Sequence, residues 1–259
     1  MNETAGQFKL TREVRFAVLP PGFVADKQVT NSFGGYPTIE GVWPFLTLRV
    51  TLTDALDPLS QYVRNIRDID HEVRSRWIGR FDPTEHPAKL LLAAFHTLQD
   101  CWMPAELDRL ELLLSPYTSF ICLKTEKPMV RLSQKFEFSA SHRLHNPSLS
   151  EADNRATFGK CNNPRGHGHN YELQVTLLGE PNATGVLINL PELEQIVQDT
   201  VIEKLDHKHL NDEVDEFRKL IPSVENIAKS VFQMLKPQLA NLKSITVWET
   251  SKTSCEYSE

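Results

Sequence analysis

Two histidines separated by one glycine mark the part of the sequence with the clearest chemical potential. His167 and His169 lie in "CNNPRGHGHNY" (161–171), where a run of β-strand composition, "NYELQVTLLG", begins. Residues i and i+2 of a strand point to the same face, so the two imidazoles are predicted to project together. The pair supplies two ligands for a metal ion, although such pairs also occur on surfaces and in cores without one.

A third ligand is predicted in "KFEFSASHRL". There His142 shares one face of an alternating strand with Phe136, Phe138 and Ala140. If this strand neighbours the strand of the histidine pair, three neutral imidazoles meet and leave a fourth position open, as in catalytic zinc sites. Zn²⁺ in such a site acts as a Lewis acid on a substrate oxygen. A satisfied, partly buried histidine at a strand end is the alternative.

Cys161 lies in a loop of Gly, Pro and Asn residues, "FGKCNNPRG", and not in an apolar segment. Lys160 and Arg165 flank it, and a cationic neighbourhood favours the thiolate. A thiolate near a metal-bound substrate is a competent base or nucleophile. A fourth zinc ligand or an inert loop thiol remains the alternative. The other cysteines are expected to pack in apolar or strand-like segments: Cys101, Cys122 and Cys255.

Further acid–base candidates lie near the C-terminus. Asp206 and His207, adjacent in "KLDHKHL", can form a carboxylate–imidazole pair, with a helix-end cap as the alternative. Glu249, in "SITVWETSK", shares a strand face with apolar residues and is expected to accept N–H donors of a ligand. Glu225 is expected in the first turn of a helix capped by Ser223, where plain helix-dipole placement is the alternative.

The predicted strands and helices that position these residues occur in the same order in both halves of the chain. "LRVTL" (48–52) is echoed by "LQVTL" (173–177), and each is followed by two helix-period segments and a β-rich segment. Each half therefore predicts a strand pair, two helices and a strand pair, which is an α+β unit. The alternative is a chance likeness of two amphipathic segments. The first helix of each half is predicted from these apolar positions: Leu59, Tyr62, Val63 and Ile66, then Leu193, Ile196, Val197 and Val201.

The two halves differ in chemistry. Six of the nine histidines lie between 142 and 209. If the strand offset holds, Val42 and Pro44 occupy the positions of the histidine pair, and Tyr117 occupies the position of Glu249. The boundary is predicted near "KTEKPM" (124–129). The first half is therefore expected to be structural.

The length, net charge and cysteine content of the chain argue against several classes of protein. The 259 residues carry a formal net charge of −6, without the basic excess that a nucleic-acid surface needs. We find no signal peptide in "MNETAGQFKLTREVRF" and no apolar run long enough for a membrane span. The four widely spaced cysteines do not suggest a disulfide framework, so a cytoplasmic location is expected.

Six ordered motifs resemble the 6-pyruvoyl-tetrahydropterin synthase family, which includes the 6-carboxy-tetrahydropterin synthases. The resemblance implies a tunnelling fold, a four-stranded antiparallel sheet with two helices on one face, whose copies form β-barrels, commonly in hexamers with sites between subunits. Residues 1–127 would then be a degenerate unit without catalytic residues and 128–259 the catalytic unit, so that three chains build a pseudo-hexamer. The motifs are "FEFSASHRL", "FGKCNNPRGHGHNY", "TGVLINLPELE", "LDHKHLN", "PSVENIA" and "VWET".

The resemblance also implies roles for the residues. Zinc would bind His142, His167 and His169, with Cys161 as the proton-abstracting base; Asp206 and His207 would be a second acid–base group, and Glu249, assisted by Glu225, would hold the pterin. The family often has two threonines where this chain has Ser223 and Val224, which puts one pterin hydrogen bond in doubt.

The reaction implied is zinc-dependent elimination of triphosphate from 7,8-dihydroneopterin triphosphate, which gives 6-pyruvoyl-tetrahydropterin. The alternatives are a 6-carboxy-tetrahydropterin synthase of a queuosine-type pathway, which releases acetaldehyde, and a non-catalytic pterin-binding assembly. Five residues separate Cys161 from His167, a spacing that resembles the pyruvoyl branch.

Overall fold

A computed structural model describes residues 6–19, 36–37 and 44–259. The chain forms two compact units. The first unit contains the residues before Ser133 together with Gly179–Leu187, and the second contains Ser133–Leu178 and Ile188–Glu259. The chain therefore enters the second unit, returns to the first over a short segment, and enters the second again. The functional division predicted near residue 128 stays a prediction.

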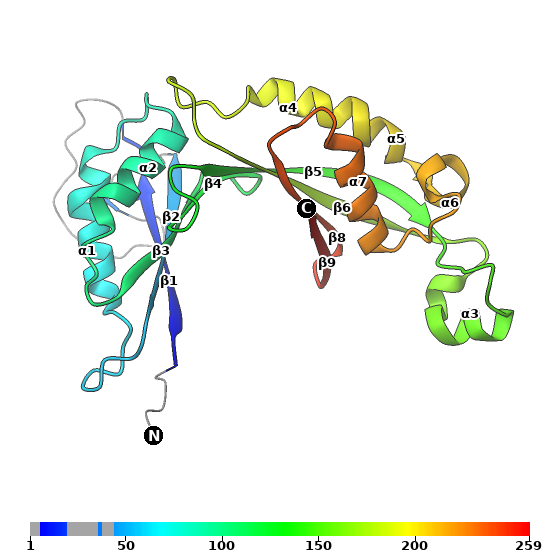
Figure 1. The fold of residues 1–259 in the computed structure, drawn as a ribbon, viewed down its shortest axis with the longest axis horizontal. Helices are drawn as coiled ribbons and strands as arrows, with labels where there is room; N and C mark the ends of the chain where they lie inside the picture. Colours follow the sequence, from blue (N-terminus) through cyan, green and yellow to red (C-terminus); the bar gives the residue numbers. More distant parts are fainter. Residues whose placement is uncertain (1–5, 20–35, 38–43) are drawn as a thin grey trace. The chain divides into compact units, whose positions relative to one another are not determined.

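The first unit is an antiparallel sheet with two helices between its second and third strands (Figure 1). Its strand order is β1-β2-β3-β4, and neighbours along this order pair antiparallel. The core lies between the sheet and the helices, where Leu48, Val50 and Leu91 are fully buried. The elements are β1 (Phe8–Ala17), β2 (Phe45–Asp54), α1 (Ile66–Arg76), a 3-10 turn (Ile78–Arg80), α2 (Pro87–Leu98), β3 (Glu106–Leu113) and β4 (Thr118–Leu123).

The helix predicted over residues 59–66 is wrong. Helix α1 begins at Ile66, and the Asn65 side chain caps it by accepting a hydrogen bond from Arg67 N. The residues before it form a turn in which the Asp57 carboxylate accepts hydrogen bonds from Leu59 N (3.1 Å) and Ser60 N (2.7 Å). This local capping competes with helix formation, so the helical period of the apolar residues there has no structural counterpart.

The second unit repeats the order of strand pair, helices and strand pair, with strand order β5-β6-β8-β9 and a short β7 that pairs parallel with β5. The predicted helix face is confirmed at Leu193, Val197 and Val201, which are fully buried, whereas Ile196 is only partly buried. The elements are β5 (Val130–His142), α3 (Glu151–Phe158), a 3-10 turn (Gly159–Asn162), β6 (His167–Gly179), α4 (Leu190–Val197), a π segment (Gln198–Ile202), α5 (Glu203–Leu205), β7 (Lys208–His209), α6 (Leu210–Glu213), a 3-10 turn (Asp215–Phe217), α7 (Val224–Leu235), β8 (Leu242–Thr250) and β9 (Thr253–Ser258).

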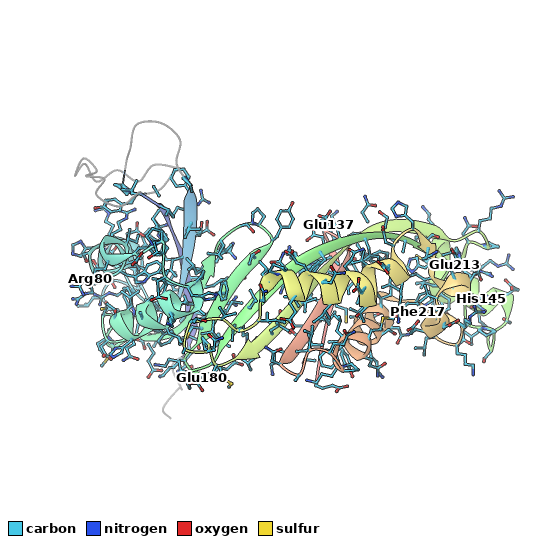
Figure 2. The ribbon with its side chains drawn as sticks, turned by 90° about the horizontal axis from the view of Figure 1, so that it is seen from above. Arg80, Glu137, His145, Glu180, Glu213 and Phe217 are labelled. Carbon is cyan, nitrogen blue, oxygen red and sulfur yellow. The ribbon has the colours of Figure 1, made fainter. Side chains whose placement is uncertain are left out.

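One face of the second sheet packs against its helices, and the other is polar. Phe138 and Ala140 of β5 are buried, whereas Glu137, directly before Phe138, is exposed (Figure 2). Alternation of this kind is expected of an antiparallel sheet that packs on one side only. Among the helices of the described residues, none combines the length and apolar character needed to cross a membrane.

The two units share their strand register. Leu48 lies opposite Leu112 in the first unit, and Leu173 lies opposite Val247 in the second. The offset is therefore 125 residues on one strand (173 − 48) and 135 on its neighbour (247 − 112). On this register the counterpart of Glu249 is Leu114, which corrects the expected Tyr117; Val42, expected opposite His167, lies outside the described residues.

The two units also share an irregularity. The pairing slips between Thr51 and Leu52 in the first unit and between Thr176 and Leu177 in the second, again 125 residues apart (176 − 51). A β-bulge depends on the local backbone of one strand. Its presence at the same place in both units is therefore a second likeness, in addition to the shared register. At both bulges the threonine hydroxyl meets a hydroxyl of the preceding strand: Thr11–Thr51 at 2.9 Å and Ser133–Thr176 at 3.0 Å.

Candidate metal centre and active site

The histidine pair opens β6, and the alternation of this strand decides where both rings point. Tyr171 and Leu173 are fully buried on the face that packs against the helices, while Glu172 between them is partly exposed. His167 and His169 precede Tyr171 in steps of two, so they project on that same face. The local sequence therefore places both imidazoles at the end of the core.

His142 ends β5 and brings a third imidazole to the same place. Its side chain is completely buried (0% exposed). The Nε2 atoms of His142 and His167 are 3.1 Å apart. The ring centroid of His169 lies 5.2 Å from that of His142 and 4.9 Å from that of His167. Two neighbouring strands thus bring the three predicted ligands together.

Glu249 of β8 joins the three rings. One ligand atom from each of the four residues lies within 4.8 Å of the others, and Glu249 Oε1 is 3.1 Å from His169 Nε2. The sequence predicts that this carboxylate accepts the N–H donors of a substrate. Here it faces the histidines, and its substrate role stays a prediction.

The donor set fits a zinc ion. Three imidazole nitrogens with one further position are the arrangement of catalytic zinc. His142 Nδ1 donates a hydrogen bond to the Pro222 carbonyl (2.7 Å), which leaves Nε2 free to act as a ligand. His169 Nε2 is buried and has no hydrogen-bond partner within the described ranges. A buried nitrogen in this state is satisfied when its lone pair binds a cation.

Burial keeps the imidazoles of His142 and His167 in the form that binds metal. Burial lowers the pKa of His142, and the neighbouring His167 and His169 lower it further. The pKa of His167 is lowered by burial first and by His169 second. Only the neutral ring can act as a ligand, so a lowered pKa widens the pH range in which the site can bind a cation.

Two groups that support His142 were missed from the sequence. One is the Pro222 carbonyl, which lies 80 residues further along the chain. The other is Tyr171, whose hydroxyl is 3.5 Å from His142 Nδ1 and whose ring stacks on Phe138 with centroids 4.9 Å apart. Extending the two-residue period of the histidine pair would have found Tyr171, whereas a backbone carbonyl leaves no trace in the residue types.

Cys161 lies beside the cluster without joining it. It is partly exposed, in the 3-10 turn Gly159–Asn162. Burial raises the pKa of the Tyr171 hydroxyl, and the charges of Glu249 and Cys161 raise it further, so the thiol is within electrostatic reach of the tyrosine. In the part of the chain that the structure describes, the fourth ligand atom of the group belongs to Glu249 and not to the thiol.

The Cys161 turn is tied to the chain that directly follows His142. Leu144 N donates to the Cys161 carbonyl (2.9 Å), and the buried Asn162 amide donates to the Leu144 carbonyl (2.8 Å). Asn211 holds the same segment by accepting from Arg143 N (2.8 Å) and donating to the Arg143 carbonyl (3.0 Å). Asn162 of the "CNN" motif and Asn211 of the "HLN" motif thus hold the Cys161 turn and the segment after His142 in place.

Asp206 and His207 form the predicted pair at the edge of β5. Asp206 Oδ2 is 2.7 Å from His207 Nδ1, and Asp206 Oδ1 accepts a hydrogen bond from Ser139 N (2.8 Å). The bond from Ser139 is the main cause that lowers the pKa of Asp206. The His207 side chain is 82% exposed. Ser139 precedes His142 by three residues of extended strand, so the pair lies about 10 Å along β5 from the cluster.

Glu225 lies in the first turn of α7, as predicted. The Ser223 side chain caps this helix by accepting a hydrogen bond from Asn226 N (3.4 Å). A hydrogen bond from the Ser223 hydroxyl lowers the pKa of Glu225. The Glu225 side chain is exposed and does not belong to the four-residue group. Its role towards a substrate stays a prediction.

Gly166, directly before the histidine pair, offers a test of this geometry. It has φ = +70°, and a Cβ there would lie 2.8 Å from the His142 carbonyl and 2.9 Å from His209 Nε2. We expect Gly166→Ala to destabilise the protein by about 1–3 kcal/mol and to weaken metal binding, because the backbone must move away from His142. Chemical denaturation and zinc titration measure the two effects.

Gly159 provides a matched control for that variant. It also has a positive φ (+53°), but a Cβ there would meet nothing within 4 Å. Gly159→Ala is expected to cost stability through backbone strain alone and to leave zinc affinity unchanged. Equal zinc affinities of the two variants would contradict the importance of the close approach at Gly166.

Comparison with known proteins places the second unit among pterin synthases. Residues 131–259 match the family model described as 6-pyruvoyl tetrahydropterin synthase. The 6-pyruvoyl tetrahydrobiopterin synthase of Homo sapiens is 39% identical over 130 residues, which cover 49% of this chain and 90% of that protein. The 6-carboxy-5,6,7,8-tetrahydropterin synthase of Haemophilus influenzae is 28% identical over 153 residues, which cover 51% of this chain and 100% of that protein.

A solved structure of the same family has a similar fold. The 6-pyruvoyl tetrahydropterin synthase of Caenorhabditis elegans superimposes with a TM-score of 0.50 at 38% identity, over 51% of this chain and 96% of that one. The predicted fold class, an antiparallel sheet with helices on one face, is therefore confirmed.

Proposed function

Because this chain belongs to the 6-pyruvoyl tetrahydropterin synthase family, we propose that it converts 7,8-dihydroneopterin triphosphate to 6-pyruvoyl-tetrahydropterin. The reaction eliminates triphosphate and moves protons within the substrate, so it requires no external oxidant or reductant. The observation that carries the proposal is the convergence of His142, His167 and His169, with the Cys161 turn hydrogen-bonded to Leu144, two residues after His142. A cation site next to a candidate base is what proton removal from an unactivated side chain requires.

We assign the three histidines to a zinc ion. Bound there, zinc would polarise the side-chain oxygens of the substrate and make the neighbouring C–H more acidic. The chain contributes the orientation of the ligands, since the Pro222 carbonyl holds the His142 ring at 2.7 Å. The alternative reading of His142 as a buried histidine satisfied by protein alone is less favourable, because it leaves His169 Nε2 without a partner in the described chain.

Cys161 is assigned as the base that removes a proton from the substrate side chain. A general base must be held within hydrogen-bond reach of the proton that it takes. Two hydrogen bonds tie the turn Gly159–Asn162 to Leu144, two residues after His142, and this attachment supports the assignment.

Asp206 and His207 are assigned as a second acid–base group. The carboxylate orients the imidazole, and the bond from Ser139 N fixes the carboxylate. The His207 side chain is exposed at the edge of β5, about 10 Å along the strand from the cluster of its own chain. This position suits a group that acts on a substrate held between two chains.

Glu249 and Glu225 are assigned to the pterin ring. A carboxylate pairs well with adjacent amino and ring N–H donors, which it accepts in bidentate fashion. Glu249 is 19% exposed, and this partial access allows a ligand to reach it. Glu225, exposed at the start of α7, would reach a pterin from a second side.

The product distinguishes the two enzyme branches. We expect the purified protein, incubated with 7,8-dihydroneopterin triphosphate, to yield 6-pyruvoyl-tetrahydropterin and triphosphate by mass spectrometry. The spacing of five residues between Cys161 and His167 supports this branch, as does the higher identity to the human protein. Release of acetaldehyde with 6-carboxy-tetrahydropterin would contradict it.

The first unit is proposed to be a second copy of the same fold without the chemistry. The shared order of elements, the shared register and the shared bulge support a duplication more strongly than the echo "LRVTL"/"LQVTL" does alone. Helices α2 and α7 have the same length of 12 residues and begin 137 residues apart (224 − 87). On the shared registers, Pro44 and Leu114 replace His169 and Glu249, so the metal ligands are missing.

This duplication predicts both assembly and metal content. If six single units usually build the enzyme, three of these chains supply six units, so light scattering should give three times the 29.6 kDa chain mass. Zinc should titrate near one per chain. A monomer would contradict the assembly, and two zinc ions per chain would contradict the inert first unit.

A further inference from the structure

The Glu249 carboxylate lies among the histidines and not in a pocket of its own. Its Oε1 atom is 3.1 Å from His169 Nε2, and the side chains of the two residues are only 19% and 17% exposed. The ligand atoms of Glu249 and the three histidines all lie within 4.8 Å of one another. The site therefore has four protein donors.

The spacing of these donors is that of neighbours around one ion. Ligands about 2.0–2.2 Å from a tetrahedral zinc are separated from each other by about 3.3 Å. The pair His142 Nε2–His167 Nε2 and the pair His169 Nε2–Glu249 Oε1 are each separated by 3.1 Å. Both pairs thus match the separation that a shared cation imposes.

The contact between Glu249 and His169 is not explained as a hydrogen bond. His169 Nε2 is buried and makes no hydrogen bond within the described ranges, although the carboxylate is so close. A neutral ring with its lone pair on Nε2 faces the anion unfavourably unless a positive charge, a proton on the ring or a bound cation, lies near both atoms. A cation that binds both atoms removes this conflict.

Glu249 lies at a bulge of the last hairpin, on the strand face of the buried Ile245 and Val247. The pairing of β8 with β9 slips between Trp248 and Thr250, so Glu249 is the extra residue without an opposite number on β9. Bulges recur next to active sites, where they change the direction of one side chain. At the corresponding place in the first unit stands Leu114, which has no donor atom.

We propose that Glu249 is the fourth protein ligand of the metal whenever no pterin is bound. The inference rests on the metal site of the proposed function and adds a second role to a carboxylate assigned there to the pterin. Glu249 would then occupy the position that an open catalytic site leaves for substrate oxygen, so that metal binding and pterin binding compete for the same side chain.

The test uses the full chain loaded with Co²⁺ or Zn²⁺ in the absence of any pterin. We expect Glu249→Gln to weaken zinc binding by about tenfold or more, because a neutral amide replaces an anionic ligand. The intense visible absorption of a four-coordinate Co²⁺ site should shift in position and intensity. Glu172→Gln is the matched control: it makes the same change of charge on the partly exposed side of β6, where Glu172 pairs with Lys135 at 2.8 Å, and should change neither readout.

Three outcomes separate this inference from the proposed function. If the wild-type chain binds metal but Glu249→Gln alters neither the affinity nor the spectrum, the fourth-ligand role is wrong and the three-histidine site stands. If the wild-type chain binds neither ion, both fail. If Glu249→Gln does not fold, Glu249→Asp keeps the charge on a shorter side chain, and an unchanged spectrum in that variant would overturn the inference.

Discussion

Replacing His167 by alanine is expected to abolish stoichiometric zinc binding and to lower kcat/KM by about a thousandfold or more. One of three imidazole ligands is lost, and with it the several kcal/mol that a bound metal contributes to the transition state. His167 Nε2 is 3.1 Å from His142 Nε2, so the loss also removes the partner that faces the buried His142 ring. Elemental analysis and initial rates measure the two effects.

A matched control for this variant lies in the first unit. His96 is exposed on α2, far along the chain from the cluster. His96→Ala should retain one zinc per chain and full activity. Activity of His167→Ala within tenfold of the wild type, or equal loss of metal in His96→Ala, would contradict the assigned site.

Replacing Cys161 by alanine is expected to lower kcat by about 10²–10⁴-fold while metal content is unchanged. The thiol is assigned as the base, yet it lies outside the group of four ligand atoms, so its loss should affect proton removal and not the ion. In Cys161→Ala the rate should therefore fall while the zinc content stays the same, whereas in His167→Ala both should fall.

The control for the cysteine is Cys101→Ala in the first unit. Cys101 is likewise partly exposed, and its thiol donates a weak hydrogen bond to the Thr97 carbonyl (3.5 Å). This variant should behave like the wild type. If Cys161→Ala lost its zinc, the thiol would have to be a ligand after all, which is the alternative that the sequence leaves open.

The arrangement of the candidate site was predictable where it follows strand periodicity. The two-residue alternation of "FEFSASH" and "HGHNY" predicts which face His142, His167 and His169 occupy, and the structure agrees. The same rule, extended by one step, would have added Tyr171. Periodicity works here because a one-residue error of register would turn every side chain to the other face.

Other parts depend on contacts distant in sequence and could not be predicted. The Pro222 carbonyl is a backbone group, which residue types do not encode, and the Asn211 side-chain amide binds the backbone of Arg143, 68 residues away along the chain. The approach of Glu249 to His169 joins strands β8 and β6, and pairing between strands is not visible in the residues of either one. Periodicity also misled, because the helical spacing of apolar residues before Ile66 predicted a helix that does not form. The Asp57 carboxylate caps a turn there instead, and this local capping outweighs a short apolar period.

The relation between the two units also needed structure. The sequence offsets suggested a weak repeat, and an offset that changes between elements does not separate duplication from chance. Strand pairing resolves that offset into one value for each strand, 125 for β2 and β6 and 135 for β3 and β8, with the bulge at the same place. The loops between the strands, and not the strands themselves, account for the change of offset.

Anomalous diffraction at the zinc absorption edge, from crystals of the full chain grown with zinc, tests the central claim most directly. We predict one strong peak per chain, about 2.0–2.1 Å from a ring nitrogen of each of His142, His167 and His169, and none in the first unit. A chain with no peak between these three rings, or with its zinc elsewhere, would contradict the account.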